Sequence, residues 1–246
     1  MTAIVFGATG AVGKHLLSSL MESNKFTSIH SFVRSLPNST SETLSKLEHH
    51  LVDFEKLCSE DEAEVGKLRK IKADAVFITL GTTRGNAGSA EKFERIDRDY
   101  VLASAKAALN PDHPSKVIYC SAQMADSSSR FLYPKSKGLT EEGLAKLYKE
   151  AIIFRPGFLA QADRPQKRIL EEIYGRITSL ASHFTPSVEI QVSTLGRAMV
   201  KAGEVGSSGL KGYGIGSPPG AKFQKQAEGD VTIVSNAEAK VLAEKS

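Results

Sequence analysis

Short apolar runs alternate with longer amphipathic stretches over the first two-thirds of the chain. The runs are nearly continuous in apolar side chains and rich in β-branched residues, which is typical of strands that are buried on both faces. This pattern predicts strands at Ile4–Phe6, Ile29–Val33, Leu51–Val52, Ala75–Thr79, Val117–Cys120 and Ile152–Phe154.

The stretches between these runs have the 3.6-residue period of helices. One predicted helix begins at Val12 and places Leu16 and Leu20 on one face, and another runs from about Glu91 to Ala108. Alternation of predicted strands and helices is typical of a parallel sheet with helices on both faces. We therefore expect an α/β fold with a Rossmann-type, doubly wound, mainly parallel sheet.

The pattern becomes looser beyond Phe154. The remaining predicted elements are, in order, a helix at Gln166–Ser182, a strand near Val188–Val192, a helix near Ser193–Ala202, a glycine-rich loop over Gly206–Gly220, a strand at Val231–Ser235 and a short final helix capped by Asn236. Because no strand leads into a helix at the glycine-rich loop, a flexible loop is favoured there over a phosphate site. We expect one domain over residues 1–246, with a cofactor-binding core at about 1–155 and a substrate-side portion at about 156–246.

Composition and charge narrow the functional classes. The 246 residues are 41% hydrophobic and 24% charged, with a net charge of +4. The basic residues are scattered rather than clustered, so no nucleic-acid binding is expected. No apolar run is long enough for a membrane helix, and Met1-Thr2 leads directly into an apolar run, which leaves no room for a signal or transit peptide.

Cysteine and histidine usage indicates neither disulfides nor metal. Cys58 and Cys120 cannot build a disulfide framework, which favours a reducing compartment. Cys120 fits a buried strand end better than a nucleophile, because no histidine lies nearby in sequence to activate it. The His49-His50 pair and His113 lack metal-ligand spacing, so no metal site is predicted.

A glycine motif stands where the first predicted strand ends and the first helix begins. In that position glycines permit close backbone approach, and the free N–H groups of the helix N-terminus bind a pyrophosphate. An ordinary glycine-rich turn is the alternative, but the order strand, GxxGxxG, helix is specific. The motif predicts dinucleotide-binding residues at Gly7, Thr9, Gly10, Ala11, Val12 and Gly13.

Residues after the next strands indicate which dinucleotide binds. An NAD-selective site places a carboxylate about 20 residues past the glycines, but Ser31–Ser35 contains none. Arg34 suits a 2′-phosphate, with a solvated surface arginine as the alternative, and we expect NADP(H) in preference to NAD(H). Asp53 and Phe54 are candidates for the adenine site, although Phe54 fits the core equally well. Gly81 would let the backbone pass close to the nicotinamide ribose.

Tyr133 is the one tyrosine of six with a lysine, Lys137, four residues on. Pro134 suits the first position of a helix, so both side chains would lie over one patch. Ser121 ends the preceding strand, at the edge where parallel sheets bind ligands. A nearby ammonium lowers the pKa of a phenol, so Tyr133 would exchange a proton with a substrate oxygen during hydride transfer. A chance YxxxK is common, but its conjunction with Ser121 and the glycine motif favours carbonyl reduction or alcohol oxidation.

These residues match, position by position, the short-chain dehydrogenase/reductase superfamily in its extended or atypical branch. Further segments resemble the HIV-Tat-interactive oxidoreductase family and its fungal mitochondrial outer-membrane relatives, namely Leu80–Gly85, Asp97–Tyr100, Phe131–Tyr133, Lys137-Gly138 and Phe154–Gly157. The resemblance covers about residues 3–160 and is thinner in the tail.

The resemblance implies an NADP(H)-binding reductase with Ser121, Tyr133 and Lys137 as its catalytic residues. It also implies that Pro156, Gly157 and Phe158 lie against the nicotinamide ring. A cytoplasmic location with peripheral attachment to the mitochondrial outer membrane follows from the fungal relatives. Asp97 stands where many superfamily members carry an asparagine that completes a proton relay, which puts that relay in doubt.

The leading hypothesis is an NADP(H)-dependent oxidoreductase acting on a small, fairly apolar carbonyl or alcohol. Thr82, which we also count among the cofactor-binding residues, would form the substrate wall with Phe158, Leu159 and the irregular segment up to about Pro186. The rival hypothesis is an NADP(H)-binding regulatory or protein-interaction module with little or no turnover. Such a module needs the glycines and Arg34 but not the catalytic trio. A membrane-surface scaffold is weakly supported without a basic amphipathic helix.

Overall fold

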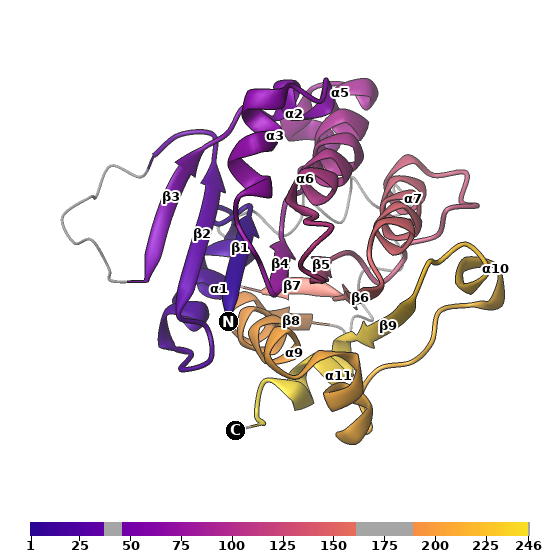
Figure 1. Ribbon diagram of the computed structural model, residues 1–246. Helices are drawn as coiled ribbons and strands as arrows, with labels where there is room; N and C mark the ends of the chain where they lie inside the picture. Colours follow the sequence, from indigo (N-terminus) through magenta and orange to yellow (C-terminus); the bar gives the residue numbers. More distant parts are fainter. Residues whose placement is uncertain (37–45, 161–188, 246) are drawn as a thin grey trace.

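The computed structural model describes residues 1–36, 46–160 and 189–245. Within them, a seven-stranded sheet has the order β3-β2-β1-β4-β5-β6-β9, and every neighbouring pair is parallel (Figure 1). The strands are β1 (Thr2–Phe6), β2 (Ser28–Val33), β3 (Leu47–Leu51), β4 (Ala75–Ile78), β5 (Lys116–Cys120), β6 (Glu150–Arg155) and β9 (Asp230–Ser235). The predicted Rossmann-type α/β fold is confirmed.

Helices cover both faces of the sheet (Figure 1). One layer contains α1 (Ala11–Glu22), α9 (Val192–Gly212) and α11 (Asn236–Leu242), and the other contains α2 (Phe54–Cys58), α3 (Glu62–Arg69), α6 (Tyr100–Ala108), α7 (Leu132–Leu147) and the short α10 (Ala221–Gln224). The smaller elements α4 (Arg84–Ala87), α5 (Ala90–Glu94) and η1 (Arg95–Asp99), a π-helical turn, lead into α6. Two strands, β7 (Phe158–Ala160) and β8 (Glu189–Gln191), form a separate parallel pair.

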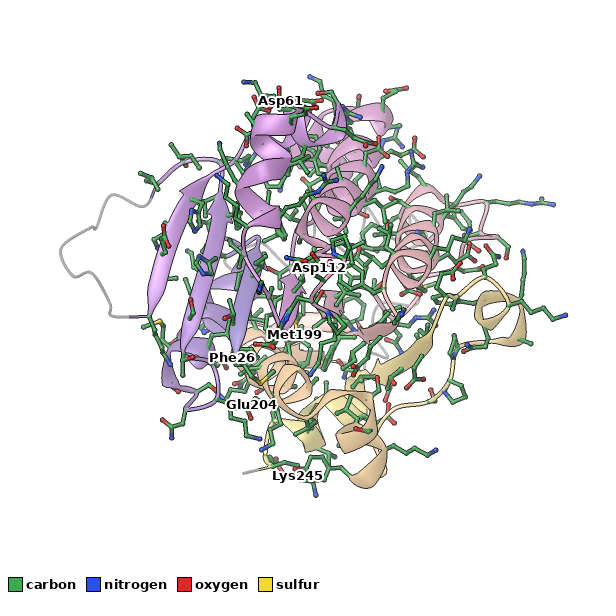
Figure 2. All side chains as sticks on the ribbon, in the orientation of Figure 1. Phe26, Asp61, Asp112, Met199, Glu204 and Lys245 are labelled. Carbon is green, nitrogen blue, oxygen red and sulfur yellow. The ribbon has the colours of Figure 1, made fainter. Side chains whose placement is uncertain are left out.

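Period-two alternation along the buried strands supplies both cores. In β1, Ala3 and Val5 belong to the core under α1 and α9, whereas Ile4 and Phe6 belong to the core under α2, α3, α6 and α7. Phe26 and Met199 also belong to the first core (Figure 2). Asp61 caps the N-terminus of α3 in the opposite helical layer. Much of the chain after residue 155 therefore completes the sheet and this core, through α9, β9 and α11.

The strand order creates a topological switch point between β1 and β4. The chain leaves β1 toward β2 and β3, then returns to β4 on the other side of β1. Connections that diverge in this way open a crevice at the carboxyl ends of the strands, where ligands bind. The glycine motif follows β1 and Gly81 follows β4, so both lie beside this crevice.

The Gly206–Gly220 prediction was wrong over its first part, because α9 continues as a helix to Gly212. The helix is kinked at Gly206, whose φ of 68° suits glycine. The Glu150 carboxylate accepts the backbone N–H of Ser207 at 2.6 Å, which caps the second half of α9. This tertiary contact outweighs the low helix propensity of the glycines.

Two other sequence expectations need correction. The predicted cap of the last helix, Asn236, is its first residue, and Ser235 is the cap in a reciprocal capping box with Glu238. The predicted continuous helix over 91–108 is interrupted by η1. The predicted helix at Gln166–Ser182 lies outside the described residues.

Candidate active site

A cavity of about 530 Å³ opens at the carboxyl edge of the sheet. Its wall is formed by the N-terminus of α1, the segments that follow β4, β5 and β6, and the first turns of α7. It brings together the following residues that the sequence singles out: Gly10, Ala11, Val12, Gly81, Thr82, Ser121, Tyr133, Lys137, Pro156, Gly157, Phe158 and Leu159. Residues up to 149 positions apart along the chain thus share one cavity, as the switch-point rule predicts.

The glycine motif forms a tight turn into α1. Gly7 has a φ of 87°, and the N–H of Gly10 donates to its carbonyl at 2.9 Å. A side chain at Gly13 is excluded, because a Cβ there would lie 2.0 Å from the Gly7 oxygen. Gly13 therefore lets α1 begin directly against the turn.

The N-terminus of α1 fits the phosphates of a dinucleotide. Gly10, Ala11 and Val12 line the cavity, and no side chain caps the helix at Gly10. The first turn of α1 holds no acidic residue. Its unpaired N–H groups and the positive end of the helix dipole are therefore available to an anion.

Arg34, Asp53 and Phe54 do not line the cavity and lie beside the more distant strands β2 and β3. Arg34 is exposed immediately after β2. Asp53 caps α2, with its carboxylate accepting the N–H of Glu55 at 2.9 Å and of Lys56 at 3.2 Å. The ring of Phe54 is buried and stacks on Tyr100 at 5.2 Å, so it is part of the core.

Tyr133 and Lys137 lie one turn apart near the start of α7. Tyr133 is partly exposed in the cavity, and the Lys137 ammonium lies 6.0 Å from its ring centre. Lys137 is buried, donates a hydrogen bond to the Tyr119 hydroxyl at 3.0 Å and pairs with Asp97 Oδ1 at 3.0 Å. Burial is the largest single influence and lowers the pKa of Lys137, but the Asp97 carboxylate together with the Tyr119 and Tyr133 phenols raises it well above its ordinary value. The ammonium beside Tyr133 thus stays charged.

Asp97 belongs to η1, and π-helical turns of this kind are frequent at functional sites. Its second carboxylate oxygen accepts the Ser136 hydroxyl at 3.2 Å. Gly81 approaches the same pair, since a Cβ there would lie 3.3 Å from Asp97 Oδ1 and 3.5 Å from Lys137 Nζ. Asp97, which the sequence resemblance implies stands in place of an asparagine, is therefore the counter-ion of Lys137.

Ser121 belongs to a second buried network that sequence reasoning missed. Its hydroxyl donates to Glu141 Oε1 at 2.5 Å, and Arg155 pairs with Glu141 through both oxygens, at 2.5 Å and 3.1 Å. Glu141 follows Lys137 by four residues and Tyr133 by eight, which places all three on one face of α7. That spacing was the available signal for Glu141, whereas nothing in the sequence singled out Tyr119.

The turn after β6 is held by a long-range hydrogen bond. The N–H of Gly157 donates to Asn236 Oδ1 at 2.9 Å, which ties the cavity wall to the start of α11. Cys120 also lines the cavity. Burial raises the pKa of its thiol to about 11, so it is protonated at neutral pH and is a poor nucleophile.

Comparison with known proteins identifies the family. Residues 3–145 match the NAD dependent epimerase/dehydratase family. The chain belongs to this family. Protein fmp52-2, mitochondrial, of Aspergillus oryzae is 32% identical over 216 residues, which cover 85% of this chain and 89% of that protein. Protein HTATIP2 of Rattus norvegicus is 34% identical over 203 residues, which cover 81% of this chain and 79% of that protein. The resemblance inferred from the motifs is confirmed.

A solved structure of an oxidoreductase of the short-chain dehydrogenase/reductase family from Burkholderia thailandensis has the same fold. It aligns with a TM-score of 0.61 at 11% identity and covers 98% of this chain and 92% of that one. Family membership makes the present chain an oxidoreductase-type protein that binds a nicotinamide dinucleotide. Among residues 1–36, 46–160 and 189–245, no helix has the length and apolar character needed to cross a membrane.

Proposed function

We propose that this protein is an NADP(H)-dependent oxidoreductase that reduces a carbonyl or oxidises an alcohol on a small, fairly apolar substrate. The observation that carries the proposal is the shared cavity, in which Ser121, Tyr133 and Lys137 meet the N-terminus of α1. A cavity of about 530 Å³ suits a small molecule. Apolar side chains line part of its wall, with Phe131 and Leu132 at the start of α7 and Phe158 on β7.

The bound dinucleotide would supply or accept the hydride. Tyr133 would donate its phenolic proton to the carbonyl oxygen in reduction, or accept the hydroxyl proton of an alcohol in oxidation. Lys137 would keep a positive charge beside that phenol and so favour the phenolate. Asp97 would hold Lys137 in place and balance its charge in the buried site.

Ser121 would act as a hydrogen-bond acceptor in the observed arrangement. Its own proton is donated to Glu141, so its oxygen lone pairs remain for the cavity. An acceptor there suits the hydroxyl of an alcohol substrate or of Tyr133. To donate to a carbonyl, Ser121 would have to release Glu141, whose charge Arg155 would still compensate.

The preference for NADP(H) would come from Arg34. Its exposed guanidinium follows β2, and Ser31–Ser35 offers no carboxylate to bind a ribose 2′-OH. A guanidinium binds a 2′-phosphate through two hydrogen bonds, which favours the phosphorylated cofactor.

The decisive experiment measures NADPH consumption with a panel of aldehydes, ketones and quinones. We expect Tyr133→Phe to lower kcat/KM by about 10²–10⁴-fold, because it removes the proton donor. The control is Tyr213→Phe, which alters an exposed tyrosine outside the cavity and should leave the rate unchanged. Fluorescence titration should give equal NADPH affinity for both variants, and full activity in Tyr133→Phe would refute the role of Tyr133.

A second candidate is a cofactor-binding regulatory module. It is favoured by the finding that buried carboxylates already engage the Lys137 ammonium and the Ser121 hydroxyl, as Asp97 and Glu141 respectively. A module of this kind would gain thermal stability with NADPH but consume none across the substrate panel. Measurable turnover that requires Tyr133 would eliminate it.

We also propose a peripheral attachment to the mitochondrial outer membrane from the cytoplasmic side. Its support is the word mitochondrial in the names of the similar fungal proteins, together with the lack of a membrane-spanning helix in the described residues. Alkaline carbonate should release such a protein from isolated mitochondria, and external protease should digest it. Resistance to both treatments would contradict the proposal.

A further inference from the structure

Three potential metal ligands meet at the edge of the sheet, and none of them lines the cavity. His30 lies on β2, and Glu48 and His50 lie on the edge strand β3. The parallel register places His30 opposite Glu48 and Phe32 opposite His50, so these side chains project from one face. Spacing along the chain could not reveal this group, because its first two members lie 18 positions apart.

The three ligand atoms have the separations that a single ion requires. His30 Nδ1 lies 3.0 Å from His50 Nε2 and 3.5 Å from Glu48 Oε2, and His50 Nε2 lies 3.7 Å from the same oxygen. A triangle with these sides has a point about 2.0 Å from all three atoms, and bonds from Zn²⁺ to histidine nitrogen or carboxylate oxygen are about 2.0–2.2 Å long. An ion therefore fits without movement of the backbone.

Surrounding contacts orient the two imidazoles. The other nitrogen of His30, Nε2, lies 3.1 Å from Ser28 Oγ, and metal-bound histidines generally use their second nitrogen in such a bond. His50 stacks on Phe32 at 4.7 Å. The side chains of His30 and His50 are 18% and 23% exposed, so the protein packs around both imidazoles. The side chain of Glu48 is 65% exposed, so its carboxylate is open to water.

We propose that His30, Glu48 and His50 form a binding site for a divalent transition-metal ion, with Zn²⁺ as its first candidate and water as a further ligand. Two imidazoles and a carboxylate with an open position are a ligand set that Zn²⁺ accepts. The ion would join β3 to β2 and so stabilise the edge of the sheet, because a ligand that binds the folded state alone raises its stability. This site is independent of the proposed oxidoreductase chemistry.

Isothermal titration of the full chain with ZnCl₂ in a non-chelating buffer tests the site. We expect one equivalent of Zn²⁺ to bind and to raise the melting temperature. His50→Gln removes a ligand and should weaken Zn²⁺ binding by at least about tenfold. Ser28→Ala removes only the hydroxyl beside His30 Nε2 and should weaken Zn²⁺ binding to a smaller degree. The matched control is His15→Gln, which removes an exposed histidine on α1 and should leave the affinity unchanged.

Glu48→Gln is a second ligand variant that we expect to remain folded, because Glu48 is largely exposed and glutamine keeps the shape of its side chain. Circular dichroism should confirm that each variant is folded. Absence of Zn²⁺ binding by the wild type would overturn the proposal, as would equal affinity in the wild type, Glu48→Gln and His50→Gln. The 3.0 Å contact would then be a histidine–histidine hydrogen bond and nothing more.

Discussion

The ammonium of Lys137 and the carboxylate of Asp97 form a buried ion pair at the edge of the cavity. Nζ lies 3.0 Å from Oδ1, and the two side chains are 5% and 0% exposed. The pair joins η1 to α7, the helix that also carries Tyr133. Because both charges are withdrawn from water, each is compensated only while the other is present.

Removal of the Asp97 charge should destabilise the protein strongly. Asp97→Asn keeps the side-chain shape but leaves Lys137 buried without a counter-ion, and we expect a loss of about 3–5 kcal/mol in the free energy of unfolding, measured by urea denaturation. Glu94→Gln is the control, because it removes a carboxylate from a partly exposed pair with Arg98 and should cost less than about 1 kcal/mol. A similar small effect for both variants would contradict the assignment.

Alanine substitutions of two helical glycines should have opposite effects. Gly13→Ala forces a Cβ to within 2.0 Å of the Gly7 oxygen, so we expect loss of stability and of NADPH binding. Gly66→Ala in α3 meets no atom within 4 Å and should stabilise the protein by about 0.5–1 kcal/mol. Thermal unfolding with and without NADPH measures both effects, and a neutral Gly13→Ala would disprove the close approach.

Arg34→Ala should change cofactor preference rather than cofactor binding as such. Loss of charge-assisted hydrogen bonds to a 2′-phosphate costs about 1.5–3 kcal/mol, which corresponds to a roughly 10–150-fold weaker affinity for NADPH. NADH affinity should stay the same, and Arg69→Ala, an exposed arginine on α3, should affect neither cofactor. Equal wild-type affinities for NADPH and NADH in fluorescence titrations would refute the preference.

Stability should fall at alkaline pH because of buried phenols. Burial raises the pKa of Tyr148, whose hydroxyl donates to the Ala105 carbonyl at 2.8 Å. A group whose pKa is raised on folding stabilises the protein below its unfolded pKa, about 10 for tyrosine, and this contribution declines as the pH rises further. At pH 10.5 the expected loss is about 1 kcal/mol for this phenol.

Tyr148→Phe isolates that contribution. The variant should be less stable at pH 8, because it loses the hydrogen bond to Ala105, but its stability should fall less between pH 8 and 10.5. Urea denaturation at the two pH values measures the difference. Parallel declines in the variant and the wild type would show that the Tyr148 phenol does not couple to folding.

The strands were predictable because each is a short apolar run in a polar context. All six strands expected before residue 155 exist, although the third ends at Leu51 and begins at Leu47, earlier than its apolar signal. Its first residues include Glu48, His49 and His50, which an exposed edge strand tolerates. No residue of β3 is fully buried, so the apolar run that guided the prediction is absent from most of this strand.

Local signals failed where distant residues decide the conformation. The glycines after Gly206 indicate a loop, yet the Glu150 carboxylate caps a helix there. Ser235 and Asn236 both suit a cap, and only the fold shows that Asn236 instead binds the N–H of Gly157. In each case the partner lies more than 50 residues away.

The sequence by itself determined the order of strands and helices, the glycine turn into the first helix, and the one-turn spacing of Tyr133 and Lys137, because all of these depend on neighbours within a few residues. Only the tertiary structure decided which carboxylates compensate Lys137 and bind Ser121, and which histidines meet at the sheet edge. Charge pairing depends on the distance between groups in space, which the sequence does not show. Parallel strands are joined by long connections, so the residues that they bring together have no regular spacing along the chain.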